Sequence, residues 1–173
     1  MGTRNLTMVI DQNGITKVAQ YGQWDGYPSG VGADILEFLH NEELFEKFKA
    51  NLSKVRFLDS KGIDKDFCVQ FDNLETRTSE QNEWYAKFIH RNLAGKVLEN
   101  IAKSELPEIV LVDESNVDAI WIEWCYSINL KENTFSVFDG VPNDEPVKVY
   151  SLDNLPNKNA FVLDCEGQDE EEE

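Results

Sequence analysis

The chain has 173 residues, of which 41% are hydrophobic and 11% aromatic, a composition that excludes an intrinsically disordered protein. It contains no apolar run of about 18 residues, so we expect no membrane span. It also begins without the basic and apolar regions of a signal peptide, and we therefore expect a cytoplasmic protein. Cys68, Cys125 and Cys165 lie far apart, which favours reduced, buried thiols over a disulfide framework.

The formal net charge is -17, and the acidic residues gather most densely at the end of the chain. Residues 164–173 hold seven acids, and the remaining 26 acids against 16 bases still leave a charge of -10. Direct contact with phosphates needs the opposite sign, so we expect no nucleic-acid partner. An acidic surface suits solubility, or docking on a basic surface of another protein. We predict a single globular domain over 1–163 and a disordered acidic tail over 164–173.

The first predicted elements form a β-hairpin. Leu6 to Gln12 and Ile15 to Tyr21 have the residue types of strands, and Asn13-Gly14 lies between them. Asn-Gly between two such runs is the strongest short hairpin signal, because both residues of the two-residue turn need positive φ. Antiparallel pairing across this turn brings residues near 5 and 6 opposite residues near 21 and 22.

Helical patterns follow. One helix is predicted to begin near residues 31–33, and Asn41 is suited to cap a second helical segment. The sequence does not decide whether this region is one bent helix or two separate helices. A further helix is predicted from Thr78 or Ser79 through Ile101, with Pro107 ending it. The apolar face of the first helical region has helical spacing and comprises Ile35, Phe38, Leu39, Leu44, Phe45, Phe48 and Leu52.

Strand patterns dominate the rest of the chain. The clearest alternation places Ile120, Ile122, Trp124, Tyr126, Ile128 and Leu130 on one face of a strand. A turn at 131–133 leads into a partner strand, 134–138, which completes a late hairpin. Shorter strands are predicted at 67–71, 109–112, 147–150 and 161–163. Because strands and helices are segregated, we expect an α+β fold with a largely antiparallel sheet, an N-terminal hairpin and two or three helices.

The candidate site is the stretch 20–32, Gln-Tyr-Gly-Gln-Trp-Asp-Gly-Tyr-Pro-Ser-Gly-Val-Gly. Its aromatic faces, amides and carboxylate suit recognition of a base, an amide or a sugar. It also leads into a helix N-terminus, where free backbone N–H groups can hold an anion. The alternative is a structural loop whose aromatics cover the edge of the core. The dinucleotide-binding fingerprint is not met, since its third glycine is missing.

The hairpin pairing adds residues of the first strand to this loop. Arg4 and Asn5 are expected beside 21–24, where a guanidinium would suit a phosphate or carboxylate. Pairing of Arg4 with Asp25 or Asp34 is the alternative. We therefore expect a small polar ligand, for example a nucleotide-like one, and no cofactor. The predicted ligand-binding residues are Arg4, Asn5, Gln20, Tyr21, Gln23, Trp24, Asp25, Tyr27 and Ser29.

Catalytic and metal patterns are weak. His40 and His90 have no second His or Cys at ligand spacing, which argues against a zinc site, and the acidic residues do not match a calcium loop. A likeness to N-terminal nucleophile hydrolases would need Thr3 at a processed terminus, whereas removal of Met1 exposes Gly2. We predict no metal, and we favour a protein that is not an enzyme.

Two segments resemble a family of uncharacterised proteins found in phages, bacteria and fungi. They are Met-Gly-Thr-Arg-Asn-Leu at 1–6 with Gln-Tyr-Gly-Gln-Trp-Asp-Gly-Tyr-Pro at 20–28, and Trp-Cys-Tyr-Ser-Ile-Asn-Leu at 124–130 with Thr-Phe-Ser-Val-Phe at 134–138. The resemblance implies a phage or bacterial origin and no particular activity. Three hypotheses remain: a ligand-binding protein, an acidic protein docking on a basic, nucleic-acid-binding surface of a host protein, and a hydrolase acting through Thr3.

Overall fold

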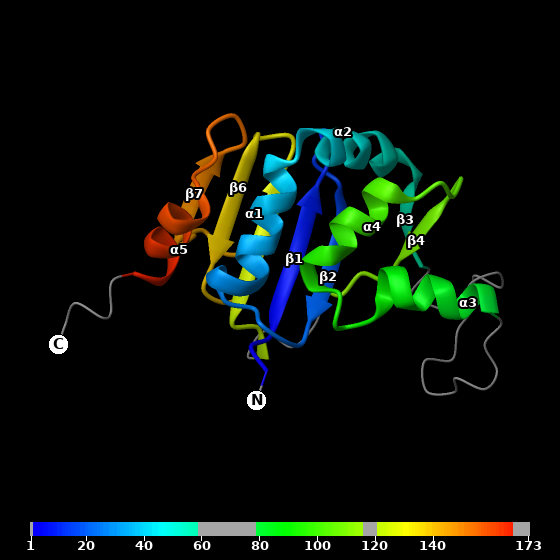
Figure 1. Ribbon diagram of the computed structural model, residues 1–173, viewed down its shortest axis with the longest axis horizontal. Coiled ribbons are helices and arrows are strands. Elements are labelled where there is room, and N and C mark those ends of the chain that lie inside the picture. Colours follow the sequence, from blue (N-terminus) through cyan, green and yellow to red (C-terminus); the bar gives the residue numbers. More distant parts are fainter. Residues whose placement is uncertain (1, 59–78, 116–120, 168–173) are drawn as a thin grey trace.

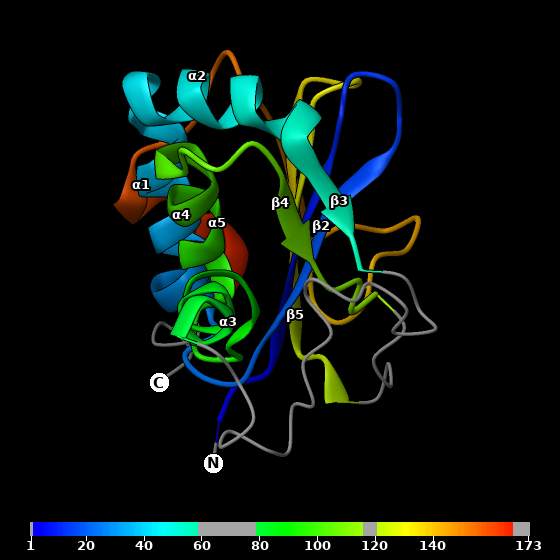
Figure 2. The same ribbon diagram turned by 90° about the vertical axis from the view of Figure 1, so that its right-hand side faces the viewer.

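The protein is an α+β domain in which helices cover one face of a five-stranded sheet (Figures 1 and 2). The computed structural model describes residues 2–58, 79–115 and 121–167. The strand order is β2-β1-β5-β6-β7, and all neighbours are antiparallel except β1 and β5. The strands of this sheet are β1 (Asn5–Ile10), β2 (Thr16–Gly22), β5 (Trp124–Asn129), β6 (Thr134–Phe138) and β7 (Lys148–Ser151). The predicted fold class, with its largely antiparallel sheet, is confirmed.

A second sheet and the helices complete the architecture. Two parallel strands, β3 (Val55–Phe57) and β4 (Ile109–Leu111), form the second sheet. The described residues contain five α-helices, more than the two or three predicted. They are α1 (Ala33–His40), α2 (Glu42–Asn51), α3 (Ser79–Trp84), α4 (Val97–Lys103) and α5 (Lys158–Glu166). Shorter helical turns lie at η1 (Pro28–Gly32), η2 (Leu52–Lys54), η4 (Tyr85–Ile89) and η5 (Ala94–Lys96).

The N-terminal hairpin is confirmed, but its turn differs from the prediction. Asn5 lies opposite Gly22, as the pairing argument requires. Only Gly14 of the predicted turn has positive φ, at 82°, and its N–H donates to the Asp11 carbonyl. The Asp11 side chain also accepts hydrogen bonds from the N–H groups of Asn13 and Ile15, each 2.9 Å long. This side-chain bonding favours a three-residue loop with a left-handed glycine over the expected two-residue turn.

The first helical region consists of two separate helices, α1 and α2, although the sequence left open one bent helix or two. Asn41 has an extended backbone, and its side chain accepts a hydrogen bond from the Leu44 N–H at 3.2 Å, so α2 starts anew. The long helix predicted up to Ile101 is wrong, because the chain breaks after η4 and Ala94 has a left-handed φ of 46°. A Cβ on Gly95 would lie 2.6 Å from the Ile35 side chain, so the break brings this turn directly against α1.

The segment after β7 also departs from the prediction. Residues 161–163, expected as a strand, belong to α5, because Asn157 caps this helix and Phe161 and Cys165 share one buried face at helical spacing. Three apolar residues alone are too few to distinguish the periodicity of a helix from the alternation of a strand. The predicted boundary at residue 164 therefore falls inside a helix. The predicted strand at 67–71 and residues 168–173 of the tail lie outside the described residues.

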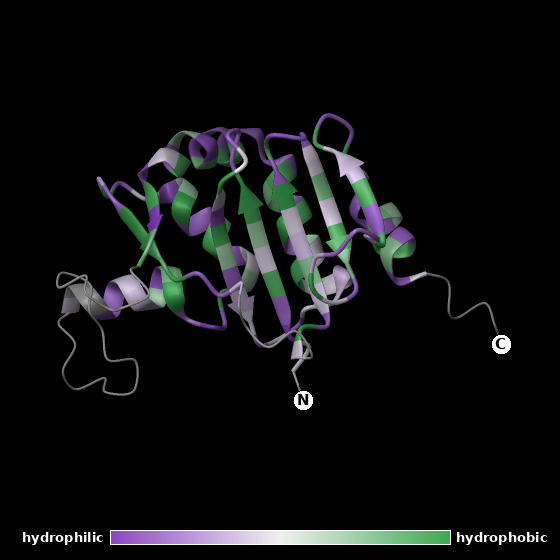
Figure 3. Cartoon of the chain, turned by 180° about the vertical axis from the view of Figure 1, so that it is seen from behind, coloured by the Kyte–Doolittle hydropathy of each residue, from purple (hydrophilic) through white to green (hydrophobic). Residues whose placement is uncertain are grey.

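The five-stranded sheet has apolar residues on both faces. The face under the helices belongs to the main core and includes Val9, Tyr126, Ile128 and Phe135. We call the opposite side the back face (Figure 3); a smaller cluster of Leu6, Ile122, Cys125 and Phe138 lies there. Contrary to the prediction, Ile122 therefore does not lie on the same face as Tyr126 and Ile128, because β5 begins only at Trp124. Within the described ranges, no helix is both long and apolar enough to cross a membrane.

Candidate functional site

The loop between β2 and α1 is fixed by polar groups of the sheet. The buried Asn5 Nδ2 lies 3.2 Å from the Thr3 carbonyl, 3.3 Å from that of Gly22 and 3.4 Å from that of Trp24. The Tyr126 hydroxyl, also buried, donates to the Gly26 carbonyl at 2.6 Å. These contacts tie the loop to β1 through Asn5 and to β5 through Tyr126, so its conformation is set by buried side chains of the sheet.

The backbone at the start of the helical region is already hydrogen-bonded within the protein. The N–H of Val31 donates to the Asp25 carbonyl at 2.8 Å, and that of Gly30 donates to the Tyr27 carbonyl at 2.9 Å. The Ser29 N–H donates to the Glu166 carboxylate of α5 at 2.8 Å. The position where an external anion was expected is therefore bonded to the chain's own carboxylate, and a ligand at this loop has to be recognised through side chains.

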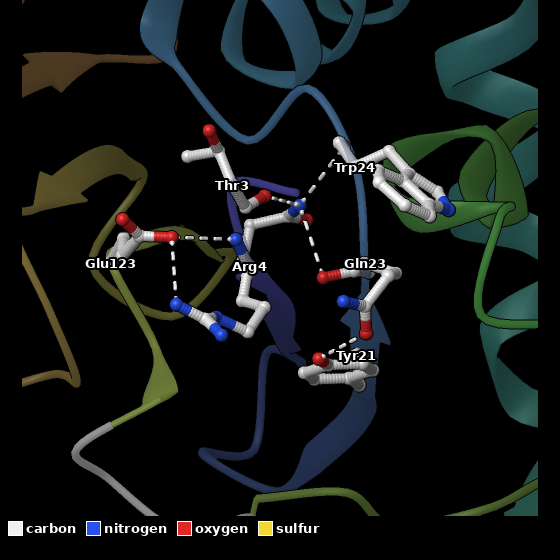
Figure 4. A network of polar contacts seen from close by, with 8 residues as sticks. Thr3, Arg4, Tyr21, Gln23, Trp24 and Glu123 are labelled. Atoms are coloured by element: carbon white, nitrogen blue, oxygen red, sulfur yellow. Dashed lines mark hydrogen bonds and ion pairs between the residues drawn. The ribbon is translucent and has the colours of Figure 1, made fainter. Parts of the chain in front are cut away.

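The predicted site residues do not form one cluster. Asn5 and Gln20 are buried on the helix side of the sheet, where the Gln20 amide donates to the Ile89 carbonyl at 3.4 Å. Trp24 and Tyr27 are 49% and 52% exposed. Asp25 and Ser29 are also exposed. Arg4, Tyr21 and Gln23 form a third group, and the Trp24 indole points away from it (Figure 4).

The third group includes two residues that the sequence did not suggest. We call Arg4, Tyr21, Gln23, Trp121 and Glu123 the Arg4 network. The Arg4 backbone N–H donates to Glu123 Oε2 at 3.0 Å, and its guanidinium lies 3.5 Å from the same oxygen (Figure 4). The guanidinium carbon is 5.1 Å from the centre of the Trp121 ring, in cation–π geometry. The ion pair of Arg4 expected with Asp25 or Asp34 is therefore wrong, because parallel pairing of β1 with β5 places Glu123 beside it.

The Arg4 guanidinium has spare hydrogen-bonding capacity. Among the described residues, its buried Nε has no hydrogen-bond partner. The side chain as a whole is 20% exposed, although the Nε atom itself is buried. A guanidinium carries five N–H donors in one plane and binds oxyanions through two of them. Arg4 can thus accept a further partner without giving up Glu123.

Tyr21 lies between charges of both signs. Its hydroxyl donates to Gln23 Oε1 at 2.6 Å. Burial raises the pKa of Tyr21, while the positive charges of Arg4 and Arg91 oppose that rise. Glu114 lies along β2, since its N–H donates to the Ala19 carbonyl at 2.9 Å. Burial raises the pKa of the Glu114 carboxyl to about 7, although it accepts a hydrogen bond from the Tyr21 backbone N–H. The site therefore contains a carboxyl that titrates near neutral pH.

Other candidate groups have structural roles. Thr3 is only 6% exposed, and its carbonyl accepts the Gly26 N–H at 3.0 Å. His40 Nε2 lies 2.7 Å from the Pro156 carbonyl. Burial raises the pKa of the Cys125 thiol to about 12 and that of Cys165 to about 11, so both are poor nucleophiles. Across the described ranges, no group of three His, Cys, Asp or Glu side chains is placed to hold a metal ion.

Comparison with known proteins returned no match: no family model, no curated protein and no solved structure is similar to this chain. The resemblance of residues 1–6 and 20–28 to a phage, bacterial and fungal family therefore stays a prediction.

Proposed function

We propose that the protein is a non-enzymatic binding protein that holds a small polar ligand at residues 20–32. The observation that carries this proposal is the exposure of Trp24 and Tyr27, 49% and 52%, on a loop whose backbone is fixed by the core. Large aromatic side chains left in water contribute little to folding, and rigid aromatic groups with polar edges are effective recognition elements. A loop fixed in this way loses little conformational entropy when a ligand binds.

The predicted residues then have two kinds of role. Asn5 and Gln20 are buried and bonded to backbone carbonyls, so they position the loop rather than touch the ligand. The side chains available for contact are the partly exposed ones, Arg4, Gln23, Trp24, Asp25 and Tyr27. Because Trp24 points away from the Arg4 network, a ligand that reaches both must extend across the loop (Figure 4). A nucleotide-like molecule, with a flat ring and a polar group at some distance, has this form.

The two alternative functions gain less support. Docking on a basic surface needs acids gathered on one face, but acids of the described chain occur in both layers and at both ends of the sheet. Examples are Glu37 and Glu46 on the helices, Glu132 and Asp153 at turns, and Asp144 in a loop. Several helical acids are also paired with lysine, as in Glu43–Lys47 and Glu99–Lys103. Hydrolysis through Thr3 would require a side chain that is now almost fully buried to become accessible.

Thermal-shift measurements against nucleosides, nucleotides and amino acids test the proposal. We expect at least one compound class to raise the melting temperature of the wild-type protein, since a ligand that binds only the folded state stabilises it. Trp24→Ala and Tyr27→Ala should reduce that rise. Ile15→Ala is the matched control, because Ile15 is 55% exposed at the opposite end of the hairpin. The proposal is abandoned if no compound shifts the wild type, or if the control lowers the response as much.

A further inference from the structure

We infer that the ligand carries an oxyanion, a carboxylate or a phosphate, and that Arg4 binds it. This inference rests on the proposed function and adds the chemical class of the ligand. Its starting point is the position of Arg4 in a strongly acidic chain. Of the three described arginines, Arg56 is paired with Glu108 on the second sheet at 2.6 Å, whereas Arg4 and Arg91 both act on Tyr21 beside the loop. Positive charge is thus available at the proposed binding end.

The geometry of Arg4 favours a second anionic partner. Its contact with Glu123 is long, 3.5 Å, and uses a terminal nitrogen, while the buried Nε has no acceptor among the described residues. A buried donor without an acceptor is costly. Because Nε is covered, the Arg4 side chain has to shift for a ligand oxyanion to accept from it, and that contact removes the cost. The Trp121 ring covers one face of the guanidinium and restricts it to a plane. A planar, pre-oriented guanidinium is the arrangement that recognises carboxylates and phosphates.

The charges around this position make anion binding depend on pH. Arg4 and Arg91 oppose Glu123 and Glu114, and of these groups Glu114 is the buried carboxyl. When Glu114 is protonated, one of the negative charges that oppose Arg4 and Arg91 is removed, so the surroundings of Arg4 are more positive by one charge than when Glu114 is ionised. Affinity for an anion should therefore fall as pH rises through about 7, the value to which burial raises the Glu114 pKa. Asp113, the neighbour of Glu114, adds a further negative charge that favours the protonated form.

Matched probes with and without an oxyanion provide the test. We would measure binding of AMP against adenosine, and of N-acetyltryptophan against its amide, by calorimetry at pH 6 and pH 8 and constant ionic strength. The charged member of a pair should bind at least about ten-fold more tightly to the wild type, since a hydrogen bond to a charged group is worth about 1.5–3 kcal/mol. The first pair reports on phosphate and the second on carboxylate, so a preference in only one identifies the oxyanion.

Variants assign the effect to the named residues. Arg4→Gln should remove the preference for the charged probe, and Arg4→Lys, which keeps the charge but loses Nε, should retain only part of it. Glu114→Gln should keep binding and abolish the change between pH 6 and pH 8 in the affinity for N-acetyltryptophan, whose carboxylate stays ionised over this range, whereas the phosphate of AMP itself titrates at about pH 6. Arg56→Gln is the control for loss of an arginine elsewhere. If Arg4→Gln fails to fold, Arg4→Lys and Glu114→Gln still decide the matter.

The outcomes separate this inference from the proposed function. Equal binding of charged and neutral probes by the wild type overturns the oxyanion inference and leaves the binding function standing. A preference for the charged probe that survives in Arg4→Gln, or that falls equally in Arg56→Gln, overturns the assignment to Arg4. If neither pair binds at all, the oxyanion inference is rejected, and the thermal-shift panel alone decides the proposed function.

Discussion

Glu114 should make the stability of this protein fall as pH rises. Its carboxyl has a pKa of about 7 in the folded protein because of burial, against an ordinary value of 4.5. The folded state therefore holds a proton that the unfolded chain has already lost between these two values, and folding is favoured at the lower pH. Replacing Glu114 by Gln removes this proton uptake while keeping a side-chain oxygen that can accept the Tyr21 N–H.

The expected magnitude follows from the two pKa values. Each pKa unit is worth about 1.4 kcal/mol, so the full difference corresponds to about 3 kcal/mol. The contribution of the protonated Glu114 carboxyl to the free energy of unfolding is intact below pH 4.5, declines between pH 4.5 and 7, and is lost above pH 7. Glu114→Gln should therefore be more stable than the wild type by about 3 kcal/mol at pH 8, and by less than about 1 kcal/mol at pH 5.

Urea unfolding at pH 5 and pH 8, followed by tryptophan fluorescence, measures this difference. Comparing variant with wild type at each pH cancels the titration of the other groups. The control is Glu132→Gln, an exposed substitution on the turn between β5 and β6 that removes the same charge. The difference in unfolding free energy between this variant and the wild type should change little with pH. If the gap between Glu114→Gln and the wild type is the same at both pH values, Glu114 does not titrate as its burial requires and the reasoning is refuted.

Two further predictions concern the elements that hold the loop and helices. Tyr126→Phe removes the hydroxyl that donates to the Gly26 carbonyl at 2.6 Å and leaves that carbonyl without this buried donor. It should lower stability by about 1–3 kcal/mol in urea unfolding and speed amide exchange in the loop, and unchanged exchange would contradict the anchoring role. Asn41→Ala removes the side-chain cap of α2 and should cost about 1 kcal/mol. Asn154→Ala, at an exposed position whose side chain makes no hydrogen bond among the described residues, is its control, and an equal loss there would mean that the cap contributes nothing specific.

The local patterns of the sequence were enough to predict the hairpin, the start of α1, the Asn41 cap and the late strands. These elements depend on residues close together in the chain, so periodicity and capping residues reveal them. The break before α4 was missed because it depends on a tertiary contact, the close approach of Gly95 to Ile35. The helix at 161–163 was missed because its buried face spans Phe161 and Cys165, beyond the three-residue run that suggested a strand.

The candidate site shows the same division between local and distant information. The hairpin register placed Asn5 opposite Gly22, so residues 4 and 5 could be assigned to the loop in advance. Trp121 and Glu123 could not be assigned, because their position depends on parallel pairing between β1 and β5. The free backbone N–H groups expected at the helix start are used by the loop and by Glu166, a contact across 137 residues that no local pattern contains.

The position of β1 between β2 and β5 has a consequence for the order in which this protein forms during synthesis. The first strand needs β5 as its second neighbour, and the contact between Arg4 and Glu123 joins residues 119 positions apart. A ribosome must therefore release most of the chain before the sheet can close, and contacts of such long range slow folding. Until then the back-face residue Leu6 lacks its β5 neighbour Cys125. Ligand binding through Arg4 would consequently report that β5 has been synthesised and has paired with β1, since a nascent fragment that ends before Glu123 lacks one side of the Arg4 network.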